Sequence, residues 1–542
     1  MRKSRTISCL FALGLISGAL AGCNLFKKDK GSTQKDPLVI PSVDVASLEI
    51  NLPNLPQRNV GDIRSDADYE YIDLYELSDF HGAVSYESHS DGDYIGLPKL
   101  ASYLDGKRAL NPGGTLVLSA GDMFQGSADS NLTRGYMVNY AMHYMGFDAM
   151  AVGNHEFDWD TDWLKKNAEL TYSGYSIPFL GANIVQNGAI PSYLKKSTVV
   201  TRGDYKIGVI GVIGSSLESS VLKTALAGCE FTKYDEILAS ESARLRSEEG
   251  CQAVILLAHE AAEHIEYTEG IDAIFGGHAH KDKVSSYGLV PAVATLNYGQ
   301  SVGHISLKFD KSTKAFVGVD KSEIETMKSV AAGLTANADI QSIMDQYAPE
   351  INKIKHIKLG TADSTLKIDG ALKNICTTTM FNEAIESVKV NNPEINPDKI
   401  VAAFHNVGGG IRADIESGDI TYGDVYKTFP FDNEIVLIKI SGSEARSKLS
   451  KLKGLGCYRL FEKKDYFNAD EDYYLVTTDY LAFSEQGFAN FRSEPLEDED
   501  LVRTGKVVRD SVAYRIYDLD KVKNTVWQHT SDYHYANIPM TF

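Results

Sequence analysis

Cysteine is scarce in this sequence, and the cysteines that are present stand far apart. There are six of them among 542 residues. Cys229, Cys251, Cys376 and Cys457 lie beyond the first 23 residues and show no CxxC-type spacing. They therefore do not form a cysteine-based metal motif. Two possibilities stay open, a disulfide between Cys229 and Cys251 or four free, buried thiols.

Positively charged residues are also fewer than negatively charged ones. The sequence has 54 lysines and arginines against 73 aspartates and glutamates, which gives a formal net charge of −19. This acidic excess argues against a nucleic-acid backbone as the main partner and favours small ligands or divalent cations. The composition is otherwise ordinary, with 43% hydrophobic and 23% charged residues and no visible internal repeat. A soluble protein of two or three domains is expected.

An apolar stretch near the start, "CLFALGLISGALAG", is too short to span a bilayer comfortably. It follows the basic "MRKSR", and the final "LAGC" resembles the lipobox of bacterial lipoproteins. This resemblance implies a signal peptide over residues 1–22 and acylation of Cys23. A plain signal peptide cut nearby and an uncleaved membrane anchor are the alternatives. The lipobox predicts an exported protein that is lipid-anchored to the bacterial membrane, facing the periplasm or the cell surface.

Polar sequence separates this leader from the rest of the chain. Residues 23–68 include "KKDKGSTQKDP" and scattered prolines, which predicts a tether. Over 69–330, short apolar runs alternate with helix-like stretches, the pattern of an α/β domain. Apolar residues at helical spacing in "IQSIMDQYAPEINKI" predict a connecting helix within 331–356. A second mixed domain is expected over 357–542.

Five apolar runs of the first domain each end in polar side chains: "YIDLYELSDFHG", "GTLVLSAGD", "FDAMAVGNHE", "AVILLAHE" and "IDAIFGGHAH". The polar groups at their ends are Asp79, His81, Asp122, Asn154, His259, His278 and His280. Strand ends of an open α/β sheet share the edge where ligands bind, so these side chains can converge. One such end alone is more often a tight turn with a satisfied histidine. Five in succession, none delivering a cysteine, indicate a metal site.

The charges of this group predict what the metal site does. Two aspartates and neutral imidazoles leave two divalent cations with a net charge of about +2, which suits a phosphate dianion. One carboxylate has to bridge both cations, and we assign that position to Asp122. Two such cations generate hydroxide near neutral pH and stabilise an in-line displacement at phosphorus. Hydrolysis of a phosphate ester is the predicted reaction.

These motifs resemble a known family. "DFHG", "GDMFQGS", "GNHEFD", "AHE" and "GGHAH" are similar to the five blocks of the calcineurin-like metallophosphoesterases, in their 5'-nucleotidase form. "NVGGGIRADIESGDITYGDVYKTFPFDNEIV" resembles the substrate-binding domain of the same family. The resemblance covers about residues 70–505. It implies a four-layer αββα metallophosphoesterase sandwich followed by an α+β substrate-binding domain, the 5'-nucleotidase C-terminal domain.

The resemblance also implies roles for individual residues. One metal ion is assigned to Asp79, His81, Asp122 and His280, and the other to Asp122, Asn154, His259 and His278. The two divalent ions are drawn from Zn, Mn, Co and Mg. His155 points at the phosphate, where it stabilises the transition state or protonates the leaving oxygen. Asp158 holds the imidazole and favours its protonated form.

Four residues of the second domain are assigned to the substrate. Arg412 offers a planar donor to phosphate or carboxylate, Phe431 and Tyr480 enclose the base as in the family, and Asn406 lies beside it. An aromatic next to a strand is more often part of a core. "NVGGGIR" has one residue more than the usual N-x-G-G-I-R, "SEQGF" places Gln486 where relatives carry an acid, and "LKNICTTTMFNEAIES" lacks the usual arginine. The sequence therefore predicts the reaction more firmly than the substrate.

The predicted function is metal-dependent hydrolysis of phosphate esters of extracytoplasmic nucleotides by a phosphoric ester hydrolase. Action on 2',3'-cyclic nucleotides or nucleotide sugars is one alternative. A surface-binding lipoprotein that keeps the fold without turnover is another. The intact set of predicted ligands, together with His155 and Asp158, favours an enzyme.

Overall fold

The computed structural model describes residues 36–88, 92–265, 269–328, 330–452, 458–459, 467–483, 496 and 500–522. The chain divides into two units, Met1–Val39 and Ile40–Phe542. Residues 36–39 of the first unit form no helix or strand. Cys23, Cys457 and Gln486 lie outside the described residues.

The first sheet of the larger unit has the strand order β14-β13-β1-β2-β3-β4. Its strands are β1 (Tyr69–Glu76), β2 (Thr115–Ser119), β3 (Ala149–Ala151), β4 (Phe179–Leu180), β13 (Ser301–Asp310) and β14 (Phe316–Thr326). Strands β1 to β4 run parallel, while β13 pairs antiparallel with both β1 and β14. The parallel strands therefore end at one edge.

The second sheet has the order β11-β12-β10-β9-β7-β6. Its strands are β6 (Ser197–Arg202), β7 (Tyr205–Ile213), β9 (Ala253–His259), β10 (Ala273–Gly276), β11 (Lys283–Tyr287) and β12 (Val290–Ala294). The four central strands are parallel, and the two edge strands are antiparallel. The central strands are almost entirely buried, as expected for a parallel sheet that is covered on both faces.

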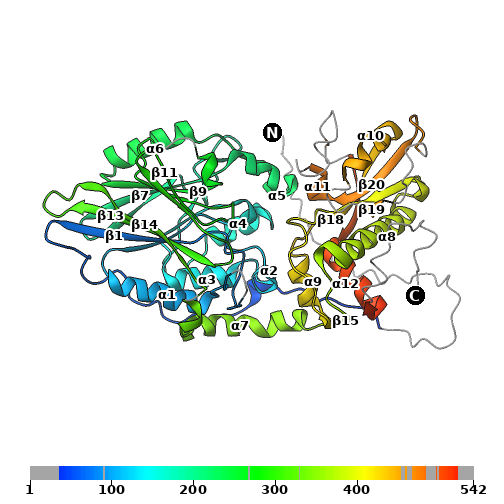
Figure 1. Ribbon diagram of the computed structural model, residues 1–542, viewed down its shortest axis with the longest axis horizontal. Helices are drawn as coiled ribbons and strands as arrows, with labels where there is room; N and C mark the ends of the chain where they lie inside the picture. The colour runs from blue at the N-terminus through cyan, green and yellow to red at the C-terminus, as the bar shows by residue number, and fades with distance from the viewer. Residues whose placement is uncertain are drawn as a thin grey trace, which may run out of the picture. The chain divides into compact units, whose positions relative to one another are not determined.

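One apolar cluster lies between the two sheets. Alternate residues of several strands contribute to it, among them Ile72 and Leu74 of β1 and Ile255 and Leu257 of β9. Helices α1 (Leu97–Leu110) and α3 (Tyr136–Met145) cover the outside of the first sheet, and α6 (Asp235–Ser247) covers the second (Figure 1). The predicted four-layer αββα fold is confirmed.

Short elements complete this region. They are the helices α2 (Ala128–Leu132), α4 (Thr161–Ala168) and α5 (Lys223–Leu226), the paired strands β5 (Ile184–Gln186) and β8 (Cys229–Phe231), and the 3-10 turns η1 (Val45–Ser47), η2 (Asn154–Phe157), η3 (Ser215–Ser220), η4 (Ala262–His264) and η5 (Ala331–Gly333). The turn η2 begins where β3 ends and carries the "NHEF" segment.

Helix α7 (Ala338–Lys355) coincides with the helical spacing in the sequence. Its buried side chains are Ile340, Ile343, Tyr347, Ile351 and Ile354. The Asn337 side chain caps its start by accepting from two backbone amides. The helix contacts α1 and α3 and also α9 of the region that follows.

The region after α7 has a five-stranded sheet, β19-β16-β20-β18-β21, and a three-stranded sheet, β17-β15-β22. Its strands are β15 (Lys358–Ala362), β16 (Ile400–Ala403), β17 (Gly418–Thr421), β18 (Glu434–Ser441), β19 (Tyr458–Arg459), β20 (Asp472–Thr478), β21 (Leu501–Val507) and β22 (Lys521–Val522). Its helices are α8 (Lys373–Asn391), α9 (Tyr422–Thr428), α10 (Gly442–Leu452), α11 (Asp479–Phe483) and α12 (Val508–Leu519), with the π-helical segment η6 (Ile368–Leu372) and the 3-10 turn η7 (Pro397–Lys399). This mixed α+β composition is the one predicted.

Part of the segment that the sequence predicted as a tether is packed. The side chains of Val43, Leu48, Ile50 and Leu52 lie against the apolar cluster beneath α1 and α3. The Gln346 side chain of α7 also exchanges hydrogen bonds with the Asn51 backbone. Leu48, Ile50 and Leu52 alternate with polar residues but form no strand, and the residues against which they pack lie far along the chain, so the sequence pattern did not reveal their packing.

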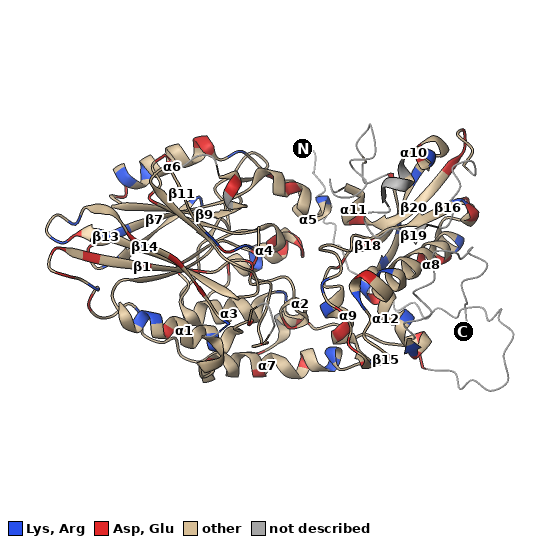
Figure 2. Ribbon diagram, in the orientation of Figure 1, with Lys and Arg blue, Asp and Glu red and all other residues tan. Residues whose placement is uncertain are grey.

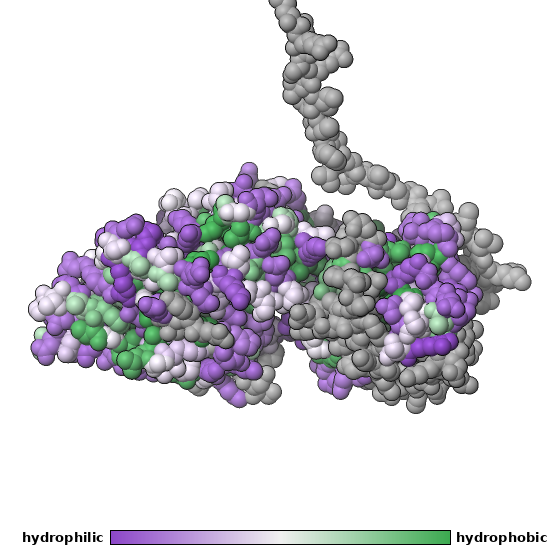
Figure 3. Space-filling model, turned by 90° about the horizontal axis from the view of Figure 1, so that it is seen from above, coloured by the Kyte–Doolittle hydropathy of each residue, from purple (hydrophilic) through white to green (hydrophobic). Residues whose placement is uncertain are grey.

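The outer surface is polar and carries both charge signs. Helix α6 begins with Asp235 and Glu236 and ends with Arg244 and Arg246, an order that suits its dipole (Figure 2). The face shown in Figure 3 is largely hydrophilic, with hydrophobic patches interspersed. Of the helices within the described ranges, none is both long and apolar enough to cross a bilayer.

Three cysteines are described, and all are free and buried. Cys229 belongs to the apolar cluster of the first sheet, whereas Cys251 belongs to the cluster under α6. The possible disulfide between Cys229 and Cys251 is therefore absent. Cys376 is buried in α8, where its sulfur lies 3.7 Å from that of Met380.

Candidate metal and substrate site

The seven predicted metal-binding side chains lie at strand ends, but the ends belong to two facing sheets. The first sheet supplies Asp79 and His81 after β1, Asp122 after β2 and Asn154 after β3, and the second supplies His259 at the end of β9 and His278 and His280 after β10. The motif positions by themselves predicted a single sheet edge, whereas the family resemblance implied a sandwich of two sheets. The αββα sandwich brings together the edges at which the parallel strands of the two sheets end, so each sheet supplies part of the ligands.

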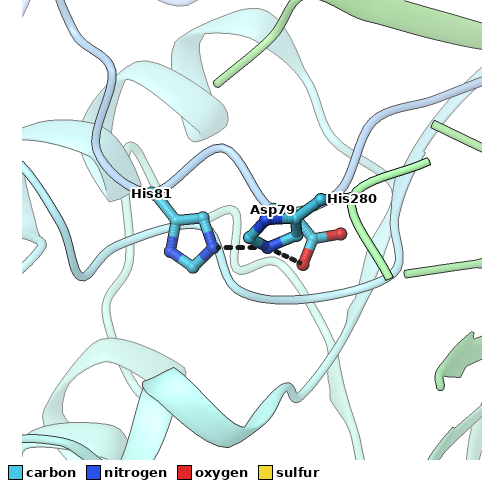
Figure 4. A group of neighbouring side chains, drawn as sticks. All are labelled: Asp79, His81 and His280. Carbon is cyan, nitrogen blue, oxygen red and sulfur yellow. Dashed lines mark hydrogen bonds and ion pairs between the residues drawn. The ribbon is translucent and has the colours of Figure 1, made fainter. Parts of the chain in front are cut away.

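Asp79, His81 and His280 form the first cluster (Figure 4). Their donor atoms lie within 4.8 Å of one another. The Nε2 atoms of His81 and His280 are 3.1 Å apart, and His280 Nε2 is 3.4 Å from Asp79 Oδ1. His81 Nδ1 lies 2.9 Å from the Gln125 carbonyl oxygen, which can only accept a hydrogen bond, so Nε2 of the neutral ring carries the lone pair.

Asp122, His259 and His278 form the second cluster, with donor atoms also within 4.8 Å. His259 Nε2 lies 3.1 Å from Asp122 Oδ2 and 3.1 Å from Asn154 Oδ1. His259 Nδ1 donates to the Ala120 carbonyl oxygen at 2.8 Å, which again directs Nε2 into the cluster. Imidazole nitrogens and carboxylate oxygens are ligands that suit divalent transition metals. Both clusters therefore fit divalent cations.

Most of these ligand positions have a strained backbone. Positive φ angles occur at Asp79 (51°), His81 (47°), Asp122 (56°), His278 (66°) and His280 (53°). This left-handed conformation costs a residue other than glycine on the order of 1–3 kcal/mol, and such strain concentrates at functional sites. Hydrogen bonds hold it in place, among them 3.0 Å bonds from the His278 amide to both Asp79 carboxylate oxygens. All five of these residues belong to one of the two clusters.

A buried carboxylate that the sequence motifs did not reveal supports this arrangement. Glu156 accepts hydrogen bonds from the backbone amides of Asp122 (2.8 Å), Met123 (2.8 Å) and Gly153 (2.7 Å). A Cβ atom on Gly153 would lie 2.2 Å from Asp122 Oδ1, so this position has room only for glycine. The sequence signal for this supporting role was the glutamate directly after "GNH". A glutamate that is buried at a strand end needs several hydrogen-bond donors around it.

His155 follows Asn154 and is held by two carboxylates. Its backbone amide donates to Asp122 Oδ1 at 2.9 Å, and its Nδ1 lies 2.8 Å from Asp158 Oδ2. Burial alone would lower the pKa of His155, but the charges of Asp158 and Asp122 outweigh burial and raise the pKa to about 9. The predicted pair of His155 and Asp158 is therefore in direct contact.

A cavity of about 200 Å³ joins these residues to the region after α7. It is lined by Asn154, His155, Asp158 and His278 on one side and by Asn406, Arg412, Phe431 and Tyr480 on the other. The four predicted substrate residues thus face the same space as the predicted pair. Trp159 and Leu222 also line it, and no sequence pattern pointed to either.

Among the residues that line this cavity, Phe431 lies against His155. Its ring stacks on His155 with centroids 5.8 Å apart and an interplanar angle of 26°. The Arg412 guanidinium carbon lies 5.2 Å from the centroid of the same ring. The Asn406 side chain donates to the Gly408 carbonyl oxygen at 3.2 Å, so its amide also holds the glycine-rich turn.

The segment 430–432 is held by residues of both regions. Asn131 of α2 donates to the Pro430 carbonyl oxygen at 3.0 Å. Asp432 pairs with Arg134 at 3.2 Å and with the buried Arg509 of α12 at 2.5 Å. Arg509 also donates to the Pro430 carbonyl oxygen at 3.3 Å. These contacts fix the backbone that carries Phe431.

Comparison with known proteins gives two family matches. Residues 74–282 match the calcineurin-like phosphoesterase model, and residues 353–454 match the 5'-nucleotidase C-terminal domain model. The second match contains Asn406, Arg412 and Phe431, and the first contains all seven metal-site residues.

Curated relatives match over more than half of this chain. Endonuclease YhcR of Bacillus subtilis is 28% identical over 71% of this chain and 33% of its own length. A probable 5'-nucleotidase of Treponema pallidum is 26% identical over 61% of this chain and 65% of its own length. The chain thus spans about a third to two thirds of the length of these relatives. The crystal structure of a 5'-nucleotidase precursor from Thermus thermophilus has a TM-score of 0.65 and 21% identity, and the match covers 83% of this chain and 97% of that one, which shows a shared fold.

Proposed function

The chain belongs to the calcineurin-like phosphoesterases that carry a 5'-nucleotidase C-terminal domain, a family of phosphoric ester hydrolases, and on this premise we propose that it hydrolyses phosphate esters of nucleotides. One observation carries the proposal. Ligands from five strand ends gather in two clusters, and the cavity beside them is shared with aromatic and basic residues of the region after α7.

Two divalent cations are part of this proposal. One is held by Asp79, His81, Asp122 and His280, and the other by Asp122, Asn154, His259 and His278. When bound, such cations act as Lewis acids that neutralise the phosphate and bring the pKa of water towards neutrality. Asp122 would be the carboxylate shared by both cations; its Oδ2 lies 3.1 Å from His259 Nε2 in the second cluster, and its Oδ1 accepts a hydrogen bond from the His155 amide.

His155 is the proposed proton donor. Asp158 accepts from its Nδ1 and thereby fixes the ring, which leaves Nε2 to donate to the phosphate or to the leaving oxygen. Phe431 and Tyr480 bind the base of the nucleotide and Arg412 binds its negative charge, with Asn406 beside them. Residues 69–330 thus bind the metals, α7 connects the two regions, and residues 357–542 select the substrate.

Location is also part of the proposal. The lipobox-like "LAGC" supports acylation of Cys23 and export to a bacterial membrane surface. Such a location suits an enzyme that acts on nucleotides outside the cytoplasm.

The function is tested by phosphate release from purified protein loaded with Zn, Mn, Co or Mg. Nucleoside 5'-monophosphates, 2',3'-cyclic nucleotides, nucleotide sugars and p-nitrophenyl phosphate form the panel. We expect His155→Ala to retain both metals while its turnover falls roughly 10²–10⁴-fold, the usual range for such groups. Metal loss in this variant would make His155 a ligand, and no hydrolysis with any ion would instead favour a binding lipoprotein.

Base recognition has its own test. Phe431→Ala or Tyr480→Ala removes a stacking surface worth on the order of 1–3 kcal/mol, so each should raise KM for nucleotides about 5- to 150-fold. The KM for p-nitrophenyl phosphate should change much less in the same variants, and Arg412→Ala should also impair nucleotides more. Equal losses for both substrates would show that Phe431, Tyr480 and Arg412 support the fold and do not bind the base.

A further inference from the structure

A cavity that the proposed reaction does not use lies at the opposite end of strand β3 from the metal ligands. Asp148, which lines it, directly precedes β3, whereas Asn154 follows that strand. The end of α3, Tyr175 and part of the packed segment 55–59 form the other walls. A single buried water needs on the order of 10–15 Å³. The cavity measures about 180 Å³ and therefore has room for a small molecule.

Buried nitrogen atoms without a hydrogen-bond partner gather around this cavity. Within the described ranges, Arg58 Nε, Arg108 Nη1 and His143 Nε2 are buried and have no such partner. Arg58 and His143 line the cavity. Arg108 lies beside it, because its Nη2 donates to the carbonyl oxygen of Gly146, another lining residue, at 3.1 Å. Buried polar groups are nearly always hydrogen-bonded, so a bound molecule or ordered water is expected to supply the partners.

The buried ring of His143 presents a hydrogen-bond acceptor. Its Nδ1 lies 2.9 Å from the Asn139 carbonyl oxygen, which can only accept, so Nδ1 carries the hydrogen and Nε2 of the neutral ring carries the lone pair. Burial lowers the pKa of His143, which favours this neutral ring. The Leu170 backbone also lies near the ring but leaves Nε2 without a hydrogen bond. A ligand that satisfies Nε2 must therefore donate a hydrogen.

The arginines around this cavity outnumber the acids. Arg58 pairs with Asp105 at 2.5 Å, and Arg202 pairs with Asp148 at 2.6 Å. Arg108 is the third arginine, 3.6 Å from the same Asp105. Burial and the charge of Arg58 lower the pKa of Arg108 to about 10, which still leaves it charged at neutral pH. The five groups carry one net positive charge, and the carbonyl end of α3 offsets about half of it. This balance favours a small anion.

We propose that this cavity binds inorganic hydrogen phosphate. The phosphate oxygens accept hydrogen bonds from Arg58 and Arg108, and its hydroxyl group donates to His143 Nε2. Sulfate and simple carboxylates offer acceptors but carry no hydrogen near neutral pH, so they leave His143 unsatisfied. Phosphate is also a product of the proposed hydrolysis, but this site lies apart from the metal ligands and does not depend on that function. Because residues 55–59 form one wall, binding should also hold this segment against the body.

Hydrogen exchange followed by mass spectrometry tests the site in the full, metal-loaded chain, because it separates this region from the active site. We expect inorganic phosphate to slow exchange in residues 55–59 and 143–148. Arg58→Gln should raise the phosphate concentration needed for this protection about 10- to 150-fold, the usual weight of a hydrogen bond to a charged group. Arg246→Gln is the matched control, because Arg246 also pairs with an aspartate at 2.5 Å and donates to a backbone carbonyl, but lies outside the cavity.

A second variant tests the class of ligand. The original protein should bind phosphate more tightly than sulfate, and His143→Leu should lose most of this preference. Equal binding of phosphate and sulfate by the original protein would overturn the inference. Tighter binding of methylphosphonate, which resists hydrolysis, would also overturn it and assign the cavity to a phosphate group on a larger molecule.

The inference and the proposed function can fail separately. Phosphate that protects neither segment, or protects both equally in Arg58→Gln and Arg246→Gln, would show that the cavity holds water only. Arg58→Gln should hydrolyse p-nitrophenyl phosphate at the original rate, since Arg58 lies at the other end of β3 from the metal ligands. A loss of this turnover would contradict a separate site.

Discussion

At the scale of single residues, the metal site depends on side chains that sit at unfavourable backbone angles. Five ligand positions have positive φ, and neither their residue type nor their spacing indicates this. The sequence did identify Asp and His at strand ends, because those residue types have no place in a core. It missed Glu156, whose hydrogen bonds run to backbone amides far along the chain.

Gly153 offers a residue-scale prediction. In Gly153→Ala the new Cβ would lie 2.2 Å from Asp122 Oδ1 and 2.8 Å from the Asp122 amide. Asp122 must move, so we expect weaker metal binding by at least about tenfold, since displaced ligands or their supports typically cost that much. Metal content after dialysis against graded chelator measures it.

The matched control is Gly106→Ala. Gly106 lies within α1, and its added Cβ meets no atom within 4 Å. Alanine in a helix interior should stabilise the fold by about 0.5–1 kcal/mol and leave the metals unaffected. Normal metal retention in Gly153→Ala would show that the Asp122 loop can shift without losing its ions.

At the scale of elements, the sequence predicted which strands end in ligands, and the αββα layers are confirmed. It did not show that the five ends come from two sheets, because strand pairing depends on contacts far apart in the chain. The packing of Leu48 and Ile50 was missed for the same reason. Strand β1 illustrates how a buried polar residue can join such elements.

Asp73 of β1 is buried and accepts hydrogen bonds from Arg64, Asn111 and His304. Burial alone would raise the pKa of Asp73, but these bonds outweigh it and hold the pKa well below the usual range. A lowered folded-state pKa adds stability above the ordinary carboxyl pKa of about 3.9, and this stability is lost as pH falls through and below that value.

We therefore expect Asp73→Asn to reduce the free energy of unfolding at pH 7 by on the order of 1–3 kcal/mol. Between pH 5 and pH 3, about one unit either side of the ordinary pKa, the variant should lose less stability than the original protein. Urea unfolding at each pH measures both effects. Asp68→Asn, at an exposed position, is the control. An unchanged pH profile in Asp73→Asn would mean that this carboxylate is not the group responsible.

At the scale of the whole molecule, the sequence predicted an anchored enzyme with separate metal and substrate regions. The structure describes the contacts between those regions, and the sequence could not have indicated them. Arg134 and Asp432, for example, are an ordinary exposed pair by residue type and stand far apart in the chain. Anchoring depends on residues outside the described part of the chain and is tested separately.

Cys23→Ser removes the thiol that acylation requires. We expect this variant to leave the membrane fraction and to appear in the soluble extract with its specific activity unchanged, because the proposed active site does not involve the leader. Immunoblots of fractionated cells measure the distribution. Cys229→Ser, at a buried thiol with no proposed lipid, is the control and should not change membrane association. Continued membrane retention of Cys23→Ser would refute the lipid anchor.

The segment 430–432 has a consequence for how this protein evolves. Asn131 of α2 donates to the Pro430 carbonyl oxygen and Arg134 pairs with Asp432, so the sequence of one region at this contact constrains the sequence of the other. Phe431, whose ring stacks on His155, lies between these two contacts. Exchanging the second region for that of a relative should therefore produce folded but inactive chimaeras, unless the α2 partners are transferred with it.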